Sequence, residues 1–346
     1  VTLLNRAPQE ATTRAASSAA VVTLPMPNGQ YARFRIVESS VLMPAMAAKF
    51  PEIKSYLGQG IDDPHAIVRF GWSPRGLGAF ILGANYSVHV FTPDARDTTT
   101  YVSANGQRGD WTCDISEGQI VKPGRGPIKD RKTSVGSQLR VYRIAIATTR
   151  EYTNDPQLGG GTIPNTVASL NTWLNGVNAI YETELSIRLT LVNNTQIIRT
   201  AEPDGFTNDN ASTMLGEVAA ILGAEVGTAN YDIGHVFAMS SSGGNGVAQL
   251  GAVCDSTNAA APAKGIGASR LSGPVNASSG MVGLIAHEFG HQFGAAHTFN
   301  STVGTTCGGQ RSPDTAWESG SGTTGAGSLE VVDEYRDIQS RMNVHQ

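Results

Sequence analysis

The stretch AHEFGHQFGAAHTF, residues 286–299, is the strongest indication of the fold and the site. It holds three of the seven histidines of the chain. His287 and His291 are four positions apart, so a helix would place both on one face, where two imidazoles can bind one metal ion. Glu288 lies one step round the same helix, beside the expected ion. Apolar residues recur at helical spacing over residues 281–289. The pattern predicts a helix that carries a metal site.

A third ligand is expected just beyond the helix. Gly294 can adopt a positive φ and end the helix, after which the chain can turn and bring back His297. Three protein ligands leave a fourth position for water, as in catalytic zinc sites. A structural zinc site is a poor alternative, because it would give Glu288 no purpose. The sequence predicts a zinc centre in which Glu288 is the general base that takes the proton of the attacking water.

Composition limits the function classes. A length of 346 residues suggests two domains. The net charge of −4 does not indicate a basic surface of the kind that binds nucleic acid. No run approaches the ~18 apolar residues of a membrane-spanning helix. The first residues lack a charged segment followed by a long apolar one, so this chain shows no signal peptide.

The N-terminal part, residues 1–120, is predicted to be a small α+β domain. Apolar runs separated by Pro/Gly turns over residues 65–93 predict an antiparallel sheet. We expect residues 1–30 to be loosely ordered, Tyr31–Ser39 to form a strand, and Met43–Gly58 to form a short helix interrupted at Pro51.

Residues 121–138 are basic and rich in glycine and proline, which predicts an exposed linker with a cleavage-type sequence, or only a domain linker. From 139 to 346 the elements alternate. We expect strands at Leu139–Thr149 and Tyr231–Met239 and long helices at Thr162–Glu184 and Ser212–Gly227. This order predicts an α/β catalytic domain with a mostly parallel sheet.

The zinc motif and its flanks carry a resemblance. HEFGHQFGAAH (His287–His297) is similar to the long zinc motif of the metzincin metallopeptidases, and Tyr231–Cys254 and Cys307–Thr324 resemble their bacterial reprolysin-like branch. Phe34–Asp63 resembles the region that precedes such catalytic domains. The resemblance implies a twisted mixed sheet with long helices, zinc as cofactor, and a secreted endopeptidase made as a zymogen. Its expected partners are a peptide or protein substrate and its own pro-domain, in a monomer.

The resemblance also implies where substrate binds. In metzincins a glycine-rich segment before the zinc helix supplies an edge strand, to which an extended peptide adds. Here the expected edge consists of Gly246, Val247, Ala248, Gln249, Leu250 and Gly251.

The C-terminal tail departs from the family pattern. A methionine turn should follow Thr324, but the tail from about residue 325 is atypical, and Met342 is its only methionine. Helix-like spacing favours a terminal amphipathic helix there over a methionine turn. The rival interpretation is therefore a catalytically impaired or latent homologue that binds zinc and peptides.

Three cysteines, Cys113, Cys254 and Cys307, leave at least one thiol unpaired in a monomer. The implied secretion favours a bridge between Cys254 and Cys307, unless one of them pairs with a cysteine in a missing C-terminal segment. Cys113 could then occupy the open zinc position and keep the enzyme latent until the linker Lys122–Lys132 is cut. A buried, inert cysteine is the interpretation we favour.

The remaining candidates lack ligand spacing. The isolated histidines, interpreted as structural or solvated, are His65, His89, His235 and His345. The residues that could contact calcium, without a motif and more readily explained as a solvated loop, are Asp204, Asp209 and Asn210.

Overall fold

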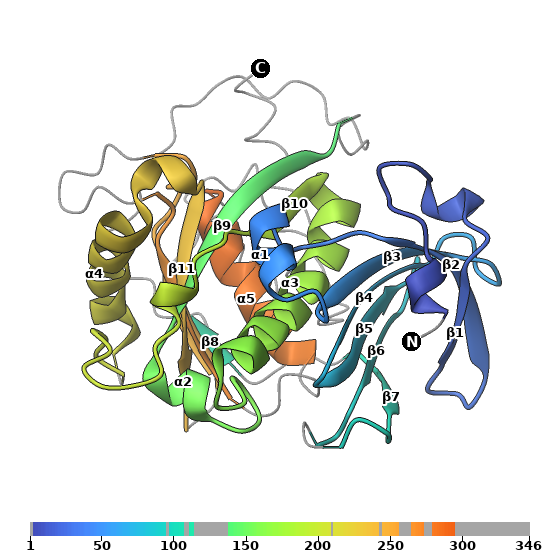
Figure 1. Cartoon of the computed structure of the whole chain (residues 1–346), viewed down its shortest axis with the longest axis horizontal. Helices are drawn as coiled ribbons and strands as arrows, with labels where there is room; N and C mark the ends of the chain where they lie inside the picture. Colours follow the sequence, from blue (N-terminus) through green and yellow to red (C-terminus); the bar gives the residue numbers. More distant parts are fainter. Residues whose placement is uncertain are drawn as a thin grey trace, which may run out of the picture.

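The computed structural model describes residues 3–94, 97–106, 111–113, 138–208, 210–241, 244–255, 264–272 and 279–294. In this part of the chain two β-sheets lie on either side of one long helix, α3 (Ile163–Leu185), as Figure 1 shows. No helix in these ranges is long and apolar enough to cross a membrane.

The first sheet is an antiparallel meander of seven strands in sequence order, as predicted for this region. The strands are β1 (Val21–Pro25), β2 (Tyr31–Glu38), β3 (Lys54–Gly60), β4 (Ile67–Ser73), β5 (Gly76–Leu82), β6 (Ser87–Phe91) and β7 (Val102–Asn105). Every strand pairs with the next one along the chain, so the sheet is built from local turns.

Two predictions for this region are wrong. Residues 1–30 are not all loosely ordered, because β1 pairs along its whole length with β2. The expected helix Met43–Gly58 is shorter, since α1 spans Pro44–Lys49 and β3 follows from Lys54. A proline at the first helical position starts α1, whereas the chain beyond Pro51 pairs with β2 and β4.

The second sheet has the order β10-β9-β11-β13-β12-β8. Its strands are β8 (Trp111–Cys113), β9 (Arg140–Thr148), β10 (Ile187–Leu191), β11 (Ile233–Met239), β12 (Gly244–Ala248) and β13 (Gly267–Leu271). All neighbouring strands are parallel except β12 and β13. The predicted mostly parallel α/β sheet is confirmed.

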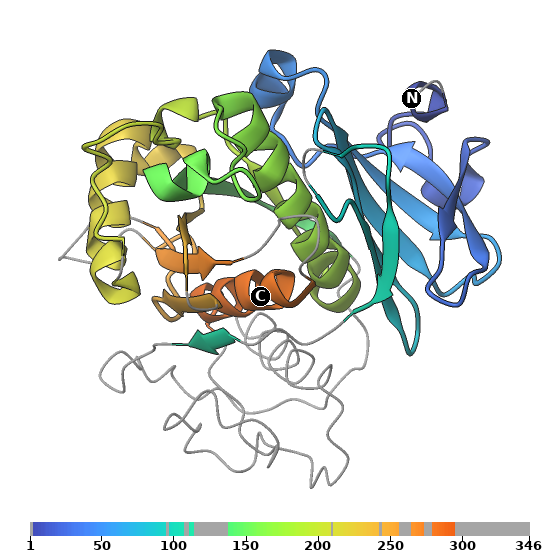
Figure 2. The ribbon, with the colours of Figure 1, turned by 90° about the horizontal axis from the view of Figure 1, so that it is seen from below.

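Helices cover both faces of the second sheet (Figures 1 and 2). The α-helices besides α1 and α3 are α2 (Arg150–Asn154), α4 (Ala211–Ile221) and α5 (Ser279–Gln292). Shorter helical turns are η1 (Leu4–Arg6), η2 (Ala15–Ser17), η4 (Thr195–Ile197), η5 (Leu222–Val226) and η6 (Thr228–Asn230). The two long predicted helices are confirmed: Thr162 caps α3 by accepting a hydrogen bond from the Asn165 amide, and Gly227, with φ 77°, follows α4 and η5.

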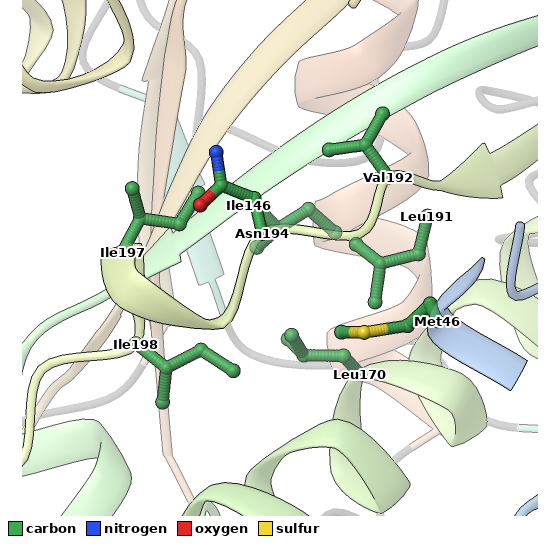
Figure 3. Close-up of a pocket in the computed structure, with 8 residues that line it drawn as sticks. All are labelled: Met46, Ile146, Leu170, Leu191, Val192, Asn194, Ile197 and Ile198. Atoms are coloured by element: carbon green, nitrogen blue, oxygen red, sulfur yellow. The ribbon is translucent and has the colours of Figure 1, made fainter. Parts of the chain in front are cut away.

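Two layers of buried apolar side chains hold this arrangement together. One cluster joins α3 and α5 to the sheet, and a second joins α4 to the opposite face. A shallow pocket lies where α1 meets the first cluster, and Met46 points there toward Leu170 and Leu191 (Figure 3). Its lining is almost entirely aliphatic and remote from α5, so it does not form part of the candidate site.

Candidate functional site

Helix α5 is held rigidly between α3 and the sheet. Leu284, Ile285 and Phe289 are fully buried, and the Tyr181 hydroxyl of α3 donates a 2.6 Å hydrogen bond to the Ala286 carbonyl. Gly294 has φ 99°, and its amide donates to the His291 carbonyl at 2.8 Å. The predicted end of the helix at this glycine is confirmed.

The imidazole rings of His287 and His291, both on α5, face each other. The Nε2 atoms of His287 and His291 lie 2.9 Å apart, and both side chains are buried. A tetrahedral zinc ion with Zn–N distances of ~2.0–2.1 Å would separate two such nitrogens by about 3.3 Å. A shift of a few tenths of an ångström would therefore fit this pair around zinc. His297 lies outside the described residues, so its role as the third ligand stays a prediction.

The side chain of Glu288, a residue of α5, packs against strand β12. This side chain is fully buried, and the backbone of Gly246 runs directly against it. A Cβ atom on Gly246 would lie only 2.5 Å from Cγ and 2.6 Å from Cδ of Glu288. The carboxyl group can occupy this position only because residue 246 has no side chain. The strand that the sequence associates with substrate thus adjoins the proposed base.

The expected edge strand Gly246–Gly251 needs a correction. Strand β12 ends at Ala248, and the next residues turn away to bind the framework: the Gln249 amide donates to the Ile266 carbonyl at 2.9 Å, and the Gly251 amide donates to the His291 carbonyl at 2.9 Å. With φ 64°, Gly251 cannot continue the strand. Only the first half of the predicted segment belongs to the strand.

Strand β12 is also not the outermost strand. Trp111–Cys113, which forms β8, pairs with it in parallel, with Gly244 opposite Trp111 and Gly246 opposite Cys113. A segment from before the basic linker therefore lies along the strand where a peptide was expected to bind. Sequence reasoning missed this pairing, because three residues carry no periodic pattern.

A buried polar network fixes the C-terminal end of α5. His235 of β11 contacts the Ser269 hydroxyl through Nε2 at 2.9 Å and the Gln292 amide oxygen through Nδ1 at 3.3 Å. The Gln292 amide nitrogen donates to the carbonyls of Gly234 and Gly265. Burial lowers the pKa of His235 to about 3, so its ring is neutral. The serine–histidine pair is fully buried and cannot reach a substrate.

The network confirms the structural interpretation of His235 and adds Gln292, which the sequence analysis missed. The available signal was a polar residue directly after His291, in a helix whose other residues on this side are mostly apolar. His65 is exposed, and His89 is buried, stacked on Phe80 and tilted against Phe91, so neither joins a ligand group among the described residues. His345 lies outside them.

Two of the expected calcium candidates accept hydrogen bonds from backbone amides. Asn210 accepts a hydrogen bond from the Thr213 amide at the start of α4, and the Asp204 carboxylate accepts from the Arg150 and Phe206 amides. Asp209 is not among the described residues.

Asp204 also belongs to an acidic group. Carboxylate oxygens of Glu151, Glu202 and Asp204 lie within 4.8 Å of one another. Arg150 pairs with Glu151 at 2.7 Å and with Glu202 at 2.8 Å, so one of the three negative charges is compensated by this arginine.

The structure describes the surroundings of only one of the two cysteines expected to form a bridge. Cys254 is exposed, with a positive φ of 63°. Partial desolvation by neighbouring groups first, and then the nearby Asp232 carboxylate, raise the pKa of its thiol. Cys307 and Met342 lie outside the described residues, so the bridge and the tail stay predictions.

Comparison with known proteins gives the family. Residues 138–331, more than half of the chain, match the family described as Metallo-peptidase family M12B Reprolysin-like. No curated protein matches the chain. A similar solved structure is that of metalloproteinase-II from Bacteroides fragilis, with 13% identity and a TM-score of 0.45 over 88% of this chain and 90% of that one. On the extent of the family match, the chain belongs to the reprolysin-like metallopeptidases.

Proposed function

We propose that this protein is a secreted zinc metalloendopeptidase in its precursor form. The observation that carries the proposal is the arrangement on α5: two buried histidines with their Nε2 atoms 2.9 Å apart, and the buried Glu288 beside them against Gly246 of β12. Family membership supports a metal-dependent peptidase. Nitrogen donors of this kind are common zinc ligands.

In the proposed reaction Glu288 is the general base. Its carboxylate takes a proton from the attacking water and later delivers it to the amine of the departing peptide. Bound zinc would lower the pKa of that water to ~7 and polarise the scissile carbonyl. His287, His291 and His297 would hold the ion. Strand β12 would align the substrate backbone by strand pairing at Gly246–Ala248.

The precursor form would be latent because β8 lies along β12. A peptide that pairs with the outer side of β12 needs the backbone groups that face Trp111–Cys113. The register places the backbone of Cys113 opposite that of Gly246, the residue against Glu288. Capture of zinc by the Cys113 thiol is one proposed cause of latency. Strand pairing alone is the competing cause of latency.

The test measures zinc content and peptide hydrolysis in the same preparation. We expect protein cut on both sides of β8, within residues 107–110 and within 121–138, to bind zinc and to hydrolyse peptides until a chelator is added. Glu288→Gln should keep zinc and lose ~10²–10⁴-fold in rate, the usual value of general acid–base help. Zinc binding without hydrolysis in protein cut on both sides of β8 would support the impaired homologue instead.

The thiol has its own test. We expect Cys113→Ser in the uncut chain to be as inactive as the parent if strand pairing causes latency, and to gain activity if the thiol captures zinc. Cys254→Ser is the matched control, because this cysteine is exposed and lies outside β8.

A further inference from the structure

The N-terminal sheet has a buried cluster of its own, but part of the N-terminal region packs into the hydrophobic core of the second sheet. Apolar side chains that precede residue 83 lie in the same buried cluster as α3 and α5, namely Val41, Leu42, Met46, Phe50, Ile53 and Phe80. Gly176 of α3 shows how tight the packing is, because a Cβ atom there would lie 2.9 Å from both Phe80 and Val282. Helix α3 is thus held between β5 on one side and α5 on the other.

A buried chain of charged side chains crosses the boundary between the N-terminal part and the rest of the described structure. Arg69 of β4 is fully buried, and its guanidinium donates two hydrogen bonds, at 2.7 and 3.1 Å, to the carboxylate of Glu182 on α3. Arg188 of β10 donates to Glu182 at 2.6 Å and to Glu10 at 2.7 and 2.9 Å. Separation of the two parts would break these hydrogen bonds and return the charges to water, so the ion pairs fix the geometry of the contact, and the apolar packing supplies most of its stability.

Neutral hydrogen bonds add to this contact. The Ser55 hydroxyl of β3 donates to Asn171 at 2.7 Å and accepts from Asn175 at 2.9 Å, and all three side chains are buried. Both asparagines lie on α3. Without β3 the Asn171 amide oxygen would lose this donor, whereas the Asn175 amide nitrogen would keep its bond to the Asn171 carbonyl at 2.8 Å.

The N-terminal part also covers both outer strands of the second sheet. At one side the Met43 amide donates to the Leu191 carbonyl at 2.9 Å, and the Leu191 amide donates to the Val41 carbonyl at 2.7 Å. At the other side β8 pairs with β12. Without these segments, β10 and β12 would present unpaired backbone groups.

From these contacts we propose that the N-terminal sheet stays bound after the linker is cut. The mature protein would then consist of two fragments, with residues up to about 120 as a permanent partner of α3. This differs from a pro-domain that leaves by dilution. It also follows that β8, which lies only a few residues after β7, stays tethered above β12 when only residues 121–138 are cut, at high effective concentration.

The experiment uses the full chain with a specific protease site placed within residues 121–138, and complete cleavage is checked under denaturing conditions. We expect both fragments to elute together at the mass of the uncut protein at micromolar concentration, and to separate only in urea. An N-terminal fragment that elutes alone in native buffer would overturn the proposal. This readout needs no enzymatic activity, so it is independent of the proposed function.

Two variants test the residues named. Arg69→Met should lower the urea concentration at which the cut fragments separate. Arg33→Met is the matched control, because Arg33 pairs only with the exposed Asp62 within the N-terminal part. Should Arg69→Met fail to fold, Ser55→Ala removes a smaller group from the same boundary. Separation at the same urea concentration for boundary and control variants would refute the assigned contacts.

Discussion

Replacement of Gly246 by alanine should damage hydrolysis more than stability. The new Cβ atom would lie 2.5 Å from Cγ of Glu288, whereas ordinary contacts begin near 3.4 Å, so the carboxyl group or the strand must move by almost 1 Å. A displacement of ~1 Å at a catalytic group can lower the rate by ~10²-fold. Overpacking of a buried position costs about 1–3 kcal/mol of unfolding free energy.

The assay compares kcat/KM on a peptide, zinc content and urea unfolding for the parent and Gly246→Ala, each cut on both sides of β8. Gly216→Ala is the control, because a Cβ atom on Gly216 of α4 meets open space. That change should leave kcat/KM unaltered and stabilise the helix by about 0.5–1 kcal/mol. If Gly246→Ala folds, binds zinc and cleaves within a few-fold of the parent, Glu288 does not act from the position described.

Three further outcomes are expected. His297→Ala should lower zinc occupancy, measured by elemental analysis, whereas the exposed His65→Ala should not; equal zinc in both would exclude His297 as a ligand. Burial lowers the pKa of His89 to about 3, so its neutral form is favoured in the fold, and this stabilisation is complete above the unfolded pKa near 6.5 and is lost as the pH falls toward 3. From pH 6.5 to 4.5 the loss should be about 2 kcal/mol, because the slope rises to its full 1.36 kcal/mol per pH unit only well below the unfolded pKa, and urea unfolding of His89→Leu should show a smaller loss; an unchanged pH dependence would contradict the assignment. Finally, a cut within residues 121–138 alone should leave peptide hydrolysis low, and a second cut within 107–110 should raise it, while full activity after the first cut would show that β8 does not block β12.

The parts of the site that follow helical periodicity could be predicted. The four-residue spacing of His287 and His291 fixes a shared face, and Gly294 fixes where the helix ends, because both depend only on local geometry. Helix α3 and strands β9 and β11 could be predicted equally well, since each has a long apolar pattern.

Long-range pairings could not be predicted in the same way. Nothing in the sequence near Arg69 shows that its charge is matched by Glu182, because the two are 113 positions apart. Trp111–Cys113 is too short to carry a strand pattern, and its pairing with β12 depends on where the N-terminal sheet is docked. The substrate segment was extended too far for a similar reason: a positive φ at Gly251 is set by its contact with α5.

The order of the elements along the chain also has a consequence for synthesis. The seven strands of the N-terminal meander pair only with their sequence neighbours, so they can fold as soon as they leave the ribosome. The second sheet needs pairings such as β9 with β11 that span about ninety residues and form slowly. Nascent α3 therefore emerges beside a finished surface that already presents Arg69, Ser55 and Phe80, which gives the later half of the polypeptide a template before its own sheet exists.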